Sequence, residues 1–477
     1  MRTHAAVPAV LAVVVLAASW PLPARGGAIV GNGTPDSCNE LALDRALGCN
    51  PSGRCSGNGN VTFNCGSGPV TVTVTSLETI VGEAGIDGGG IVTLDGGGKT
   101  PLFHVVDGGT LSLANVTIRG GVGGYGGSVS NSNGTLTVTN CTFSGNSAVL
   151  GGAIANIEGE LSVTNSTFTD NSSNGDNGAD GGAIYSAGNL DVTVTNSTFS
   201  GNSSNGGNGG GINSTGPLTV TNSTFSGNSA SSTAGLGGDG GAIANNDPVA
   251  AVTLTNCTFS GNSAVHGGAI SWSGNPLGSF GHPVTVTNTI FSTSTGGNCY
   301  VDNNSCILVG GCANAITDGG HNLEDSESCD FSTANRSLSN TNPGLNSAGL
   351  ANNGGPTQTI ALQAGSPAIN AGDESVCSAP PVNNLDQRGS RRPGVGATNC
   401  SIGAYEYNVQ RSSCVGDCDG SGDVTVNEII TLVNVALGTK HAADCPNGLP
   451  TGATDSDVTV ALIIQAVNHA LNGCAAG

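Results

Sequence analysis

A nineteen-residue phrase, VTNCTFSGNSAVLGGAIAN, occupies residues 138–156 and returns with small changes from residues 163, 194, 220 and 254. In each copy apolar and polar residues alternate before an asparagine, and a phenylalanine then opens a second apolar stretch. Alternation with a period of two predicts a strand with one buried face. Asparagine tolerates left-handed backbone geometry, so it suits a corner between two short strands. Each copy therefore predicts short strands joined by tight corners.

The corner asparagine recurs at intervals of 25, 25, 31, 26, 34 and 32 residues, at Asn115, Asn140, Asn165, Asn196, Asn222, Asn256 and Asn288. A unit of this length is one coil of a parallel β-solenoid, in which coils stack at about 4.8 Å and equal side chains form columns. We therefore predict an internal column of aromatic rings at Phe143, Phe168, Phe199, Phe225 and Phe259. Most length variation falls between FSGNS and GGAI, so one face should carry the loops.

The chain is poor in charge and strongly acidic. Only 9% of its 477 residues are charged, and 33 acidic residues against 12 basic ones give a net charge of −21. The 79 glycines would suit disorder, but the regular alternation of Val, Ile, Leu and Thr is typical of a folded β protein. Because negative charge repels nucleic acid and anionic membranes, we expect no nucleic-acid partner.

The N-terminal residues indicate export. Arg2 precedes the apolar run AAVPAVLAVVVLAA, and small residues follow, which is the pattern of a signal peptide. The run is shorter than the roughly 20 residues that span a bilayer, and no later stretch is long enough, so we expect no transmembrane span after signal cleavage. All 16 cysteines follow this segment, which predicts disulfides that staple the ends of an extracellular fold.

Two groups of motifs resemble known families. The words GGAI (151–154, 181–184, 240–243, 267–270) and FxxN, the latter beginning at each predicted column phenylalanine, resemble the repeats of polymorphic outer membrane proteins. That family is a right-handed β-helix family, and the resemblance, over roughly residues 100 to 295, implies surface display and adhesion. The segments DGGHNL (318–323), GSPAINAG (365–372) and IGAYEY (402–407) look like the choice-of-anchor Q region of bacterial secreted proteins, which implies an extracellular location.

The C-terminal segment DCDGSGDVTVNE, residues 417–428, fits the twelve-residue EF-hand calcium loop. Calcium prefers hard oxygen ligands wrapped through a sharp bend, which Gly422 provides. The loop positions one, three, five, seven (through its carbonyl), nine and twelve predict a Ca²⁺ site formed by Asp417, Asp419, Ser421, Asp423, Thr425 and Glu428. An acidic turn without metal is the alternative.

A second copy of this segment, DSDVTVALIIQAVNHALNG, begins at Asp455, and the pair resembles the duplicated calcium module of dockerins. The resemblance implies a cohesin-like partner. In the second copy, loop positions one, three and twelve are occupied by Thr451, Ala453 and Leu462, so we expect one calcium ion per tail. We also predict that the tail cysteines form two disulfides: Cys414, Cys418, Cys445 and Cys474.

The repeats offer little for catalysis. From Gly120 to Ala334 there is neither Lys nor Arg, whereas a polyuronate lyase needs a basic side chain to abstract a proton. Glycoside hydrolases need two close carboxyl groups, and Asp and Glu stand apart in the repeats. We therefore assign no catalytic residue.

Single side chains in the repeats have structural explanations. Histidines without a second ligand at metal spacing are expected at the surface or in packing: His104, His266 and His282. Cysteines in place of the usual Ser are expected to be buried and stacked: Cys141 and Cys257. Acidic residues in longer loops are expected to be solvated, or to form a weak calcium or glycan site: Asp176, Asp180 and Asp239.

These patterns predict an all-β protein with a small α-helical C-terminal module. The predicted segments are a signal peptide (1–26), an N-terminal disulfide-bearing cap (27–80), a right-handed parallel β-helix (81–295), its continuation with the anchor-like region (296–410), and a dockerin-like calcium-binding module (411–477). The leading hypothesis is a secreted or cell-surface structural or adhesion protein that binds a glycan or a surface protein through its looped face. The alternative is an extracellular polysaccharide lyase or glycoside hydrolase.

Overall fold

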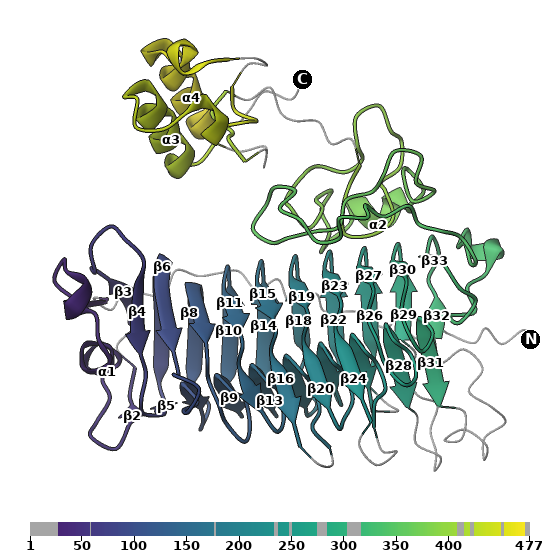
Figure 1. The fold of residues 1–477 in the computed structure, drawn as a ribbon, viewed down its shortest axis with the longest axis horizontal. Helices are drawn as coiled ribbons and strands as arrows, with labels where there is room; N and C mark the ends of the chain where they lie inside the picture. The colour runs from purple at the N-terminus through teal and green to yellow at the C-terminus, as the bar shows by residue number, and fades with distance from the viewer. Residues whose placement is uncertain are drawn as a thin grey trace, which may run out of the picture.

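The computed structural model describes ten stretches of the chain, residues 27–57, 59–175, 178–232, 237–247, 250–273, 284–302, 316–407, 415–419, 424–449 and 453–472. They form a right-handed parallel β-solenoid, a C-terminal segment that lies along its upper edge in Figure 1, and a small helical module. The predicted fold class is confirmed.

The coils stack into three parallel sheets. The largest sheet contains β1 (Ala28–Val30), β3 (Gly59–Phe63), β4 (Val70–Thr73), β6 (Glu83–Asp95), β8 (Thr110–Arg119), β10 (Thr135–Thr139), β11 (Thr142–Ser144), β14 (Glu160–Thr164), β15 (Thr167–Thr169), β18 (Val192–Thr195), β19 (Thr198–Ser200), β22 (Leu218–Thr221), β23 (Thr224–Ser226), β26 (Val252–Thr255), β27 (Thr258–Ser260), β29 (Val284–Thr287), β30 (Ile290–Ser292), β32 (Ile316–Asp318) and β33 (Leu323–Glu324). The second sheet contains β2 (Arg54–Cys55), β5 (Glu78–Ile80), β7 (Phe103–Val105), β9 (Val129–Ser132), β13 (Ile154–Ile157), β17 (Ile184–Ala187), β21 (Ile212–Ser214), β25 (Ile243–Asn245), β28 (Ile270–Ser273) and β31 (Cys299–Asp302). The smallest sheet contains β12 (Ser147–Ala148), β16 (Ser172–Asn174), β20 (Ser203–Asn205) and β24 (Ser229–Ser231).

The corner asparagines take the left-handed conformation that the sequence predicts. All seven, from Asn115 to Asn288, have φ between 47 and 52°. Asn115 lies within the unbroken strand β8, which pairs with both β10 and β11 of the next coil. The chain therefore turns at Asn115 although β8 is still one strand, whereas the next coil has two strands, β10 and β11, in its place.

The predicted aromatic column is confirmed. Phe143 pairs in register with Phe168, and the same register continues through Phe199, Phe225 and Phe259. Neighbouring ring centroids in these five residues lie 4.7 to 4.9 Å apart, and Phe291 continues the stack at 5.0 Å. Ring stacking thus follows directly from the spacing of parallel strands.

A second asparagine column lies inside the solenoid. Its members, which follow the Phe column by three residues, are fully buried: Asn146, Asn171, Asn202, Asn228 and Asn262. The Asn171 amide donates to Oδ1 of Asn202 at 2.9 Å and to the carbonyl of Phe143 at 3.0 Å, and the pattern repeats along the column. Asparagine suits this position because its amide both donates and accepts hydrogen bonds.

The N-terminal end of the stack is closed by α1 (Glu40–Leu47), which follows the short 3₁₀ helix η1 (Pro35–Ser37). Leu43 and Leu47 of α1 are buried in the solenoid core. Disulfides join Cys38 to Cys65 and Cys49 to Cys55 at this end, and Cys299 to Cys329 near the other end. The prediction that disulfides staple the ends is confirmed for these pairs.

After β33 the chain turns back along the solenoid. Residues 343–407, which we call the clamp, follow η3 (Thr333–Asn335), include α2 (Glu374–Ser378), and contain the Cys377–Cys400 disulfide. The Gln387 amide donates to the Thr198 hydroxyl at 2.8 Å and accepts from the Thr224 hydroxyl at 2.6 Å. Asn288 Oδ1 accepts from the backbone N–H of Asp373 at 2.8 Å. The clamp therefore covers the corners of consecutive coils (Figure 1).

The C-terminal module contains α3 (Val426–Ala436), η4 (Ala442–Asp444), η5 (Asp455–Asp457) and α4 (Val460–Asn472). Leu432, Val435 and Ala466 form its small core, beside the Cys418–Cys445 disulfide. Cys414 and Cys474 lie outside the described residues, so their predicted pairing stays a prediction. Within the ten described stretches, no helix is long and apolar enough to cross a bilayer.

Candidate functional site

Four polar residues form a ladder at the turn before each Gly-Gly pair of the second sheet. Asp180, Asn208, Asp239 and His266 occupy this position in successive coils, as the backbone hydrogen bonds of the following glycines show. The Asp180 carboxylate accepts from the backbone N–H of Asn208 at 2.7 Å, and Asn208 Oδ1 accepts from that of Asp239 at 3.0 Å. Asp239 Oδ1 lies 2.8 Å from His266 Nδ1. The side chains of Asp180, Asn208 and Asp239 thus each bond to the next coil.

Tyrosines flank both ends of this ladder. The Tyr300 ring stacks on His266 with centroids 4.5 Å apart. At the other end, burial and then the charge of Asp180 raise the pKa of the Tyr185 hydroxyl, and Tyr125 stands 57% exposed nearby. Burial also raises the pKa of the Asp180 carboxyl group. We call Tyr125, Tyr185, the four ladder residues and Tyr300 the polar ladder site.

Part of the polar ladder site is open to solvent. The His266 side chain is 50% exposed and the Asp239 side chain 30%. The site combines acceptors, an imidazole and aromatic faces, which is the mixture that orients polar ligands in protein sites. In the sequence, Asp180 and Asp239 group with Asp176 as loop acids that are expected to be solvated or to form a weak calcium or glycan site, whereas His266 is expected to be a separate surface or packing residue. Asp176 lies outside the described residues. Aligning the repeats on their Gly-Gly pairs, instead of on the corner asparagine, would have revealed the column.

The predicted calcium ligands are partly brought together. Carboxylate oxygens of Asp417, Asp419 and Glu428 all lie within 4.8 Å of one another. Asp417 is fully buried and Glu428 is 7% exposed. Ser421 and Asp423 lie outside the described residues, and Thr425 is the N-cap of α3. Three of the six predicted ligands therefore converge on one point.

Glu428 joins this cluster to the start of α3. Its Oε2 accepts from the backbone N–H and the hydroxyl of Thr425 at 2.7 and 2.9 Å, and its Oε1 accepts from the backbone N–H of Asp419 at 3.1 Å. Burial raises the pKa of the Glu428 carboxyl group, hydrogen bonds oppose the shift, and the charge of Asp419 adds to it. The carboxylate therefore faces the acidic cluster with its lone pairs only partly used.

The second half of the module is held by protein contacts. Asp455 accepts from the backbone N–H of Ala442 at 2.6 Å and pairs with His441 at 2.9 Å. The hydrogen bond from Ala442, and next the one from His441, lower the pKa of the exposed Asp455 carboxyl group. The hydrogen bond with Asp455 raises the pKa of His441. Thr451 lies outside the described residues. The Asp455 carboxylate thus serves as a loop contact.

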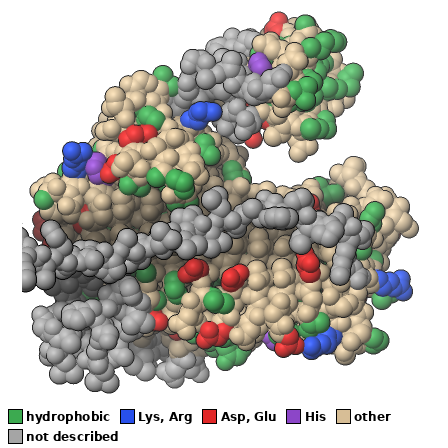
Figure 2. All heavy atoms as spheres, turned by 180° about the vertical axis from the view of Figure 1, so that it is seen from behind, with side chains coloured by type: hydrophobic (Ala, Val, Ile, Leu, Met, Phe, Trp, Pro, Cys, Tyr) green, Lys and Arg blue, Asp and Glu red, His purple; other side chains and the backbone are tan. Residues whose placement is uncertain are grey.

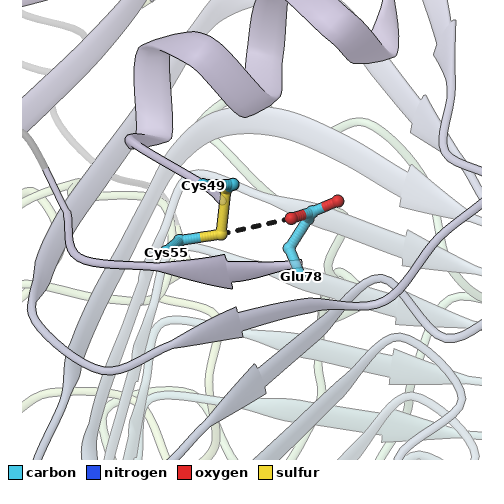
Figure 3. Close-up of side chains that lie close together, drawn as sticks. All are labelled: Cys49, Cys55 and Glu78. Carbon is cyan, nitrogen blue, oxygen red and sulfur yellow. Dashed lines mark hydrogen bonds between the residues drawn. A yellow bond between two sulfur atoms is a disulfide. The ribbon is translucent and has the colours of Figure 1, made fainter. Parts of the chain in front are cut away.

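A third group of side chains could be mistaken for a metal site. Cys49, Cys55 and Glu78 lie together beneath α1 (Figure 3). The two sulfur atoms form a disulfide, so neither is a thiolate available to a metal. Glu78 Oε2 lies 3.1 Å from Cys55 Sγ, and the side chain is only 1% exposed. Burial, and next the charge of Asp44, raise the pKa of Glu78 to about 7.

A groove on the outer face of the largest sheet is lined by two carboxylates that come from adjacent coils. Glu160 and Asp191 line it together with Thr137, Ser162 and Leu190, around a cavity of about 330 Å³. Both carboxylates are exposed. Glycosidases instead keep one carboxyl group protonated, commonly by burying it. Two acids thus line one groove, but neither is buried.

The two free cysteines of the described chain are buried, as predicted. Burial raises the pKa of the Cys141 thiol to about 11 and that of Cys257 to about 12. Since the thiolate is the reactive form, neither cysteine is suited to nucleophilic chemistry at neutral pH.

Comparison with known proteins agrees with the β-helical fold. Residues 102–277 match the family model described as the right handed beta helix region. No curated protein and no solved structure matches the chain. The matched residues hold the aromatic column, the buried asparagine column and most of the polar ladder site.

Proposed function

We propose that this protein is a secreted or cell-surface β-helical scaffold that binds a glycan along the polar ladder site. The observation that carries the proposal is the unbroken chain of contacts from Asp180 through Asn208 and Asp239 to His266 and Tyr300. Charged and aromatic residues make up only 9% and 4% of the chain, so their concentration in one column is a specific feature. The export pattern and the disulfides support an extracellular location.

A glycan fits this site better than the other extracellular ligand classes. The four ladder residues stand on coils that stack at about 4.8 Å, so they span about 14 Å along the solenoid axis. Carboxylate, amide and imidazole groups bond to sugar hydroxyls, and the Tyr300 and Tyr125 rings offer apolar faces for sugar C–H groups. A neutral glycan is favoured because the net charge of −21 opposes an anionic ligand.

A glycan array followed by calorimetry on the full chain tests this proposal. His266→Ala removes the ring that touches both Asp239 and Tyr300, and loss of one hydrogen bond that involves a charged group, about 1.5–3 kcal/mol, corresponds to roughly 10- to 150-fold weaker binding. His104→Ala, on the same sheet but distant in the stack, is the matched control and should bind as the wild type. Unchanged binding by both His266→Ala and Tyr300→Ala would place the ligand elsewhere, and absence of any glycan ligand would refute the proposal.

Polysaccharide cleavage is the second candidate, and the groove of Glu160 and Asp191 is the observation that favours it. The same preparations, incubated with the glycans that bind, should be assayed for new reducing ends and for unsaturated uronides. We expect no release. Release that disappears in Glu160→Gln, and persists in the exposed-glutamate control Glu158→Gln, would establish hydrolysis in the groove instead.

We also propose that the C-terminal module binds one calcium ion through Asp417, Asp419 and Glu428, with Ser421, Asp423 and Thr425 completing the loop. Converging carboxylates repel one another, and a divalent cation offsets that repulsion. Extracellular modules commonly bind calcium at about 10⁻⁴ to 10⁻³ M, which is sufficient for occupancy outside cells.

Calorimetric titration of the full chain with calcium tests this part separately. Glu428→Gln should weaken binding about tenfold or more, because it removes a charged ligand. Asp455→Asn, in the half whose carboxylate is held by His441 and Ala442, should leave binding unchanged. A tail stoichiometry near two, or binding insensitive to the Glu428 change, would contradict the assignment.

A further inference from the structure

The C-terminal module exposes an unusual amount of apolar surface for its size. Among the described residues, seven of the seventeen exposed large apolar side chains belong to α3, its C-cap and α4. Figure 2 shows hydrophobic side chains gathered on one side of this module, whereas those on the visible solenoid surface are scattered. Exposed apolar patches of this kind mark interaction surfaces.

The exposed side chains form the same pattern on both helices. On α3 and its C-cap they are Val426, Ile430 and Leu437, with the half-buried Val433 completing the set, and on α4 they are Val460, Ile464, Val467 and Leu471. Both sets follow the spacing four, three, four, with the same residue type at each position. We call these two sets the VIVL seams.

The VIVL seams are not required for the core of the module itself. Leu432, Val435 and Ala466, at other positions of the helices, are buried between them. Seven of the eight seam residues are between 36% and 76% exposed, and only Val433 is half-buried. A four-three spacing of apolar residues is the signature of helices that pack against other helices. The seams are therefore available to a helical partner.

Charge allows that partner to be a second copy of this chain. The chain carries a net charge of −21, so association through most of its surface is opposed by repulsion. On α4 there is no Asp, Glu, Lys or Arg, and on α3 the single charged residue, Glu428, is 7% exposed and directed to Thr425 and Asp419. The seams are thus neutral strips on an acidic molecule.

We infer that two copies of the chain associate through their C-terminal modules, with the VIVL seams of one copy packed against those of the other in a four-helix arrangement. Identical seams are self-complementary, and a two-fold axis brings the same patch of both copies together. Seven exposed side chains at roughly 50–100 Å² each supply about 350–700 Å² per copy, close to the approximately 800 Å² per partner of a standard interface. This inference is independent of glycan binding and of calcium.

Sedimentation equilibrium of the full chain over a range of protein concentrations, at one fixed calcium concentration, tests the inference. The wild type should form a dimer that dissociates on dilution. The double variant Leu437→Gln/Leu471→Gln should raise the dimer dissociation constant more than tenfold. Leu41→Gln on α1, which replaces another exposed helical leucine outside the module, is the matched control and should leave the dissociation constant unchanged.

A second variant pair, Ile430→Gln/Ile464→Gln, lies about two turns closer to the start of each helix and should have the same effect. Hydrogen exchange of the α3 and α4 amides shows whether the helices remain formed in each variant. A wild-type chain that stays monomeric at every concentration overturns the inference. This holds even if a different protein is then found to bind the VIVL seams. A dimer that persists in both variant pairs with intact helices overturns it as well, because the contact must lie elsewhere.

Discussion

Glu78 provides a direct test of how the N-terminal end of the stack responds to pH. The side chain is 1% exposed, contacts the Cys49–Cys55 disulfide and accepts a hydrogen bond from the Ser76 hydroxyl at 3.1 Å. Its pKa is raised from 4.5 to about 7, so the folded chain holds this proton more tightly than the unfolded chain. The stabilisation is fully present below pH 4.5, is lost as pH rises, and is gone above about pH 7.

The size of the effect follows from the shift. A change from 4.5 to about 7 is about 2.5 pKa units, and at about 1.4 kcal/mol per unit the loss is at most about 3.5 kcal/mol. Glu78→Gln keeps the shape of the protonated acid but cannot ionise. We therefore expect the variant to keep its cap stability from pH 5 to pH 8, whereas the wild type loses stability over this range.

Native-state hydrogen exchange of the α1 amides, corrected for the intrinsic pH dependence of exchange, measures opening of this end of the stack. Glu83→Gln, which changes an exposed glutamate of the same region, is the control and should follow the wild type. Equal pH dependence in the wild type and in Glu78→Gln would refute the reasoning. So would a Glu78→Gln variant less stable than the wild type at pH 8.

Other predictions concern the solenoid interior. Phe199→Ala, in the middle of the aromatic column, should lower the free energy of unfolding, measured in urea, by about 3–5 kcal/mol. A loss below about 1 kcal/mol would mean that the neighbouring rings move to fill the cavity. Asn202→Ala leaves buried partners unsatisfied at about 1–3 kcal/mol each, whereas Asn205→Ala on the outer surface should cost less than about 0.5 kcal/mol in the same measurement. Cys141 and Cys257 should react with a thiol reagent at pH 8 only after unfolding, and rapid labelling of the native chain would contradict their burial.

The repeating part of the fold was predictable because stacking places the same residue type at the same position in every coil. Asn140 and Phe143 show this directly, the first by its left-handed φ and the second by its ring stack. The sequence around Asn146 is less decisive, since an asparagine after a strand suits both an exposed corner and a buried column. Only the neighbouring coils, which supply its hydrogen-bond partners, distinguish the two.

Features that do not repeat could not be predicted. Gln387 bonds to Thr198 across a sequence separation of 189 residues, and no local pattern indicates such a contact. Likewise, Asp239 and His266 meet only because loops of unequal length return to the same Gly-Gly turn. In the tail, by contrast, Asp417, Asp419 and Glu428 converge as the loop spacing predicts, because the spacing is local.

The clamp gives the solenoid two unequal ends. In a bare solenoid each coil touches only its neighbours, so opening can begin at either end and spread coil by coil. Gln387 and Asp373 connect the clamp to coils from Thr198 to Asn288, so these coils cannot separate singly without releasing the clamp. Among the described residues before Asn196, the ends of the coils are held by stacking, α1 and two disulfides, and no contact with the clamp is found. Under a pulling force we therefore expect the chain to peel from the N-terminal side, with the clamped coils yielding last and as one unit.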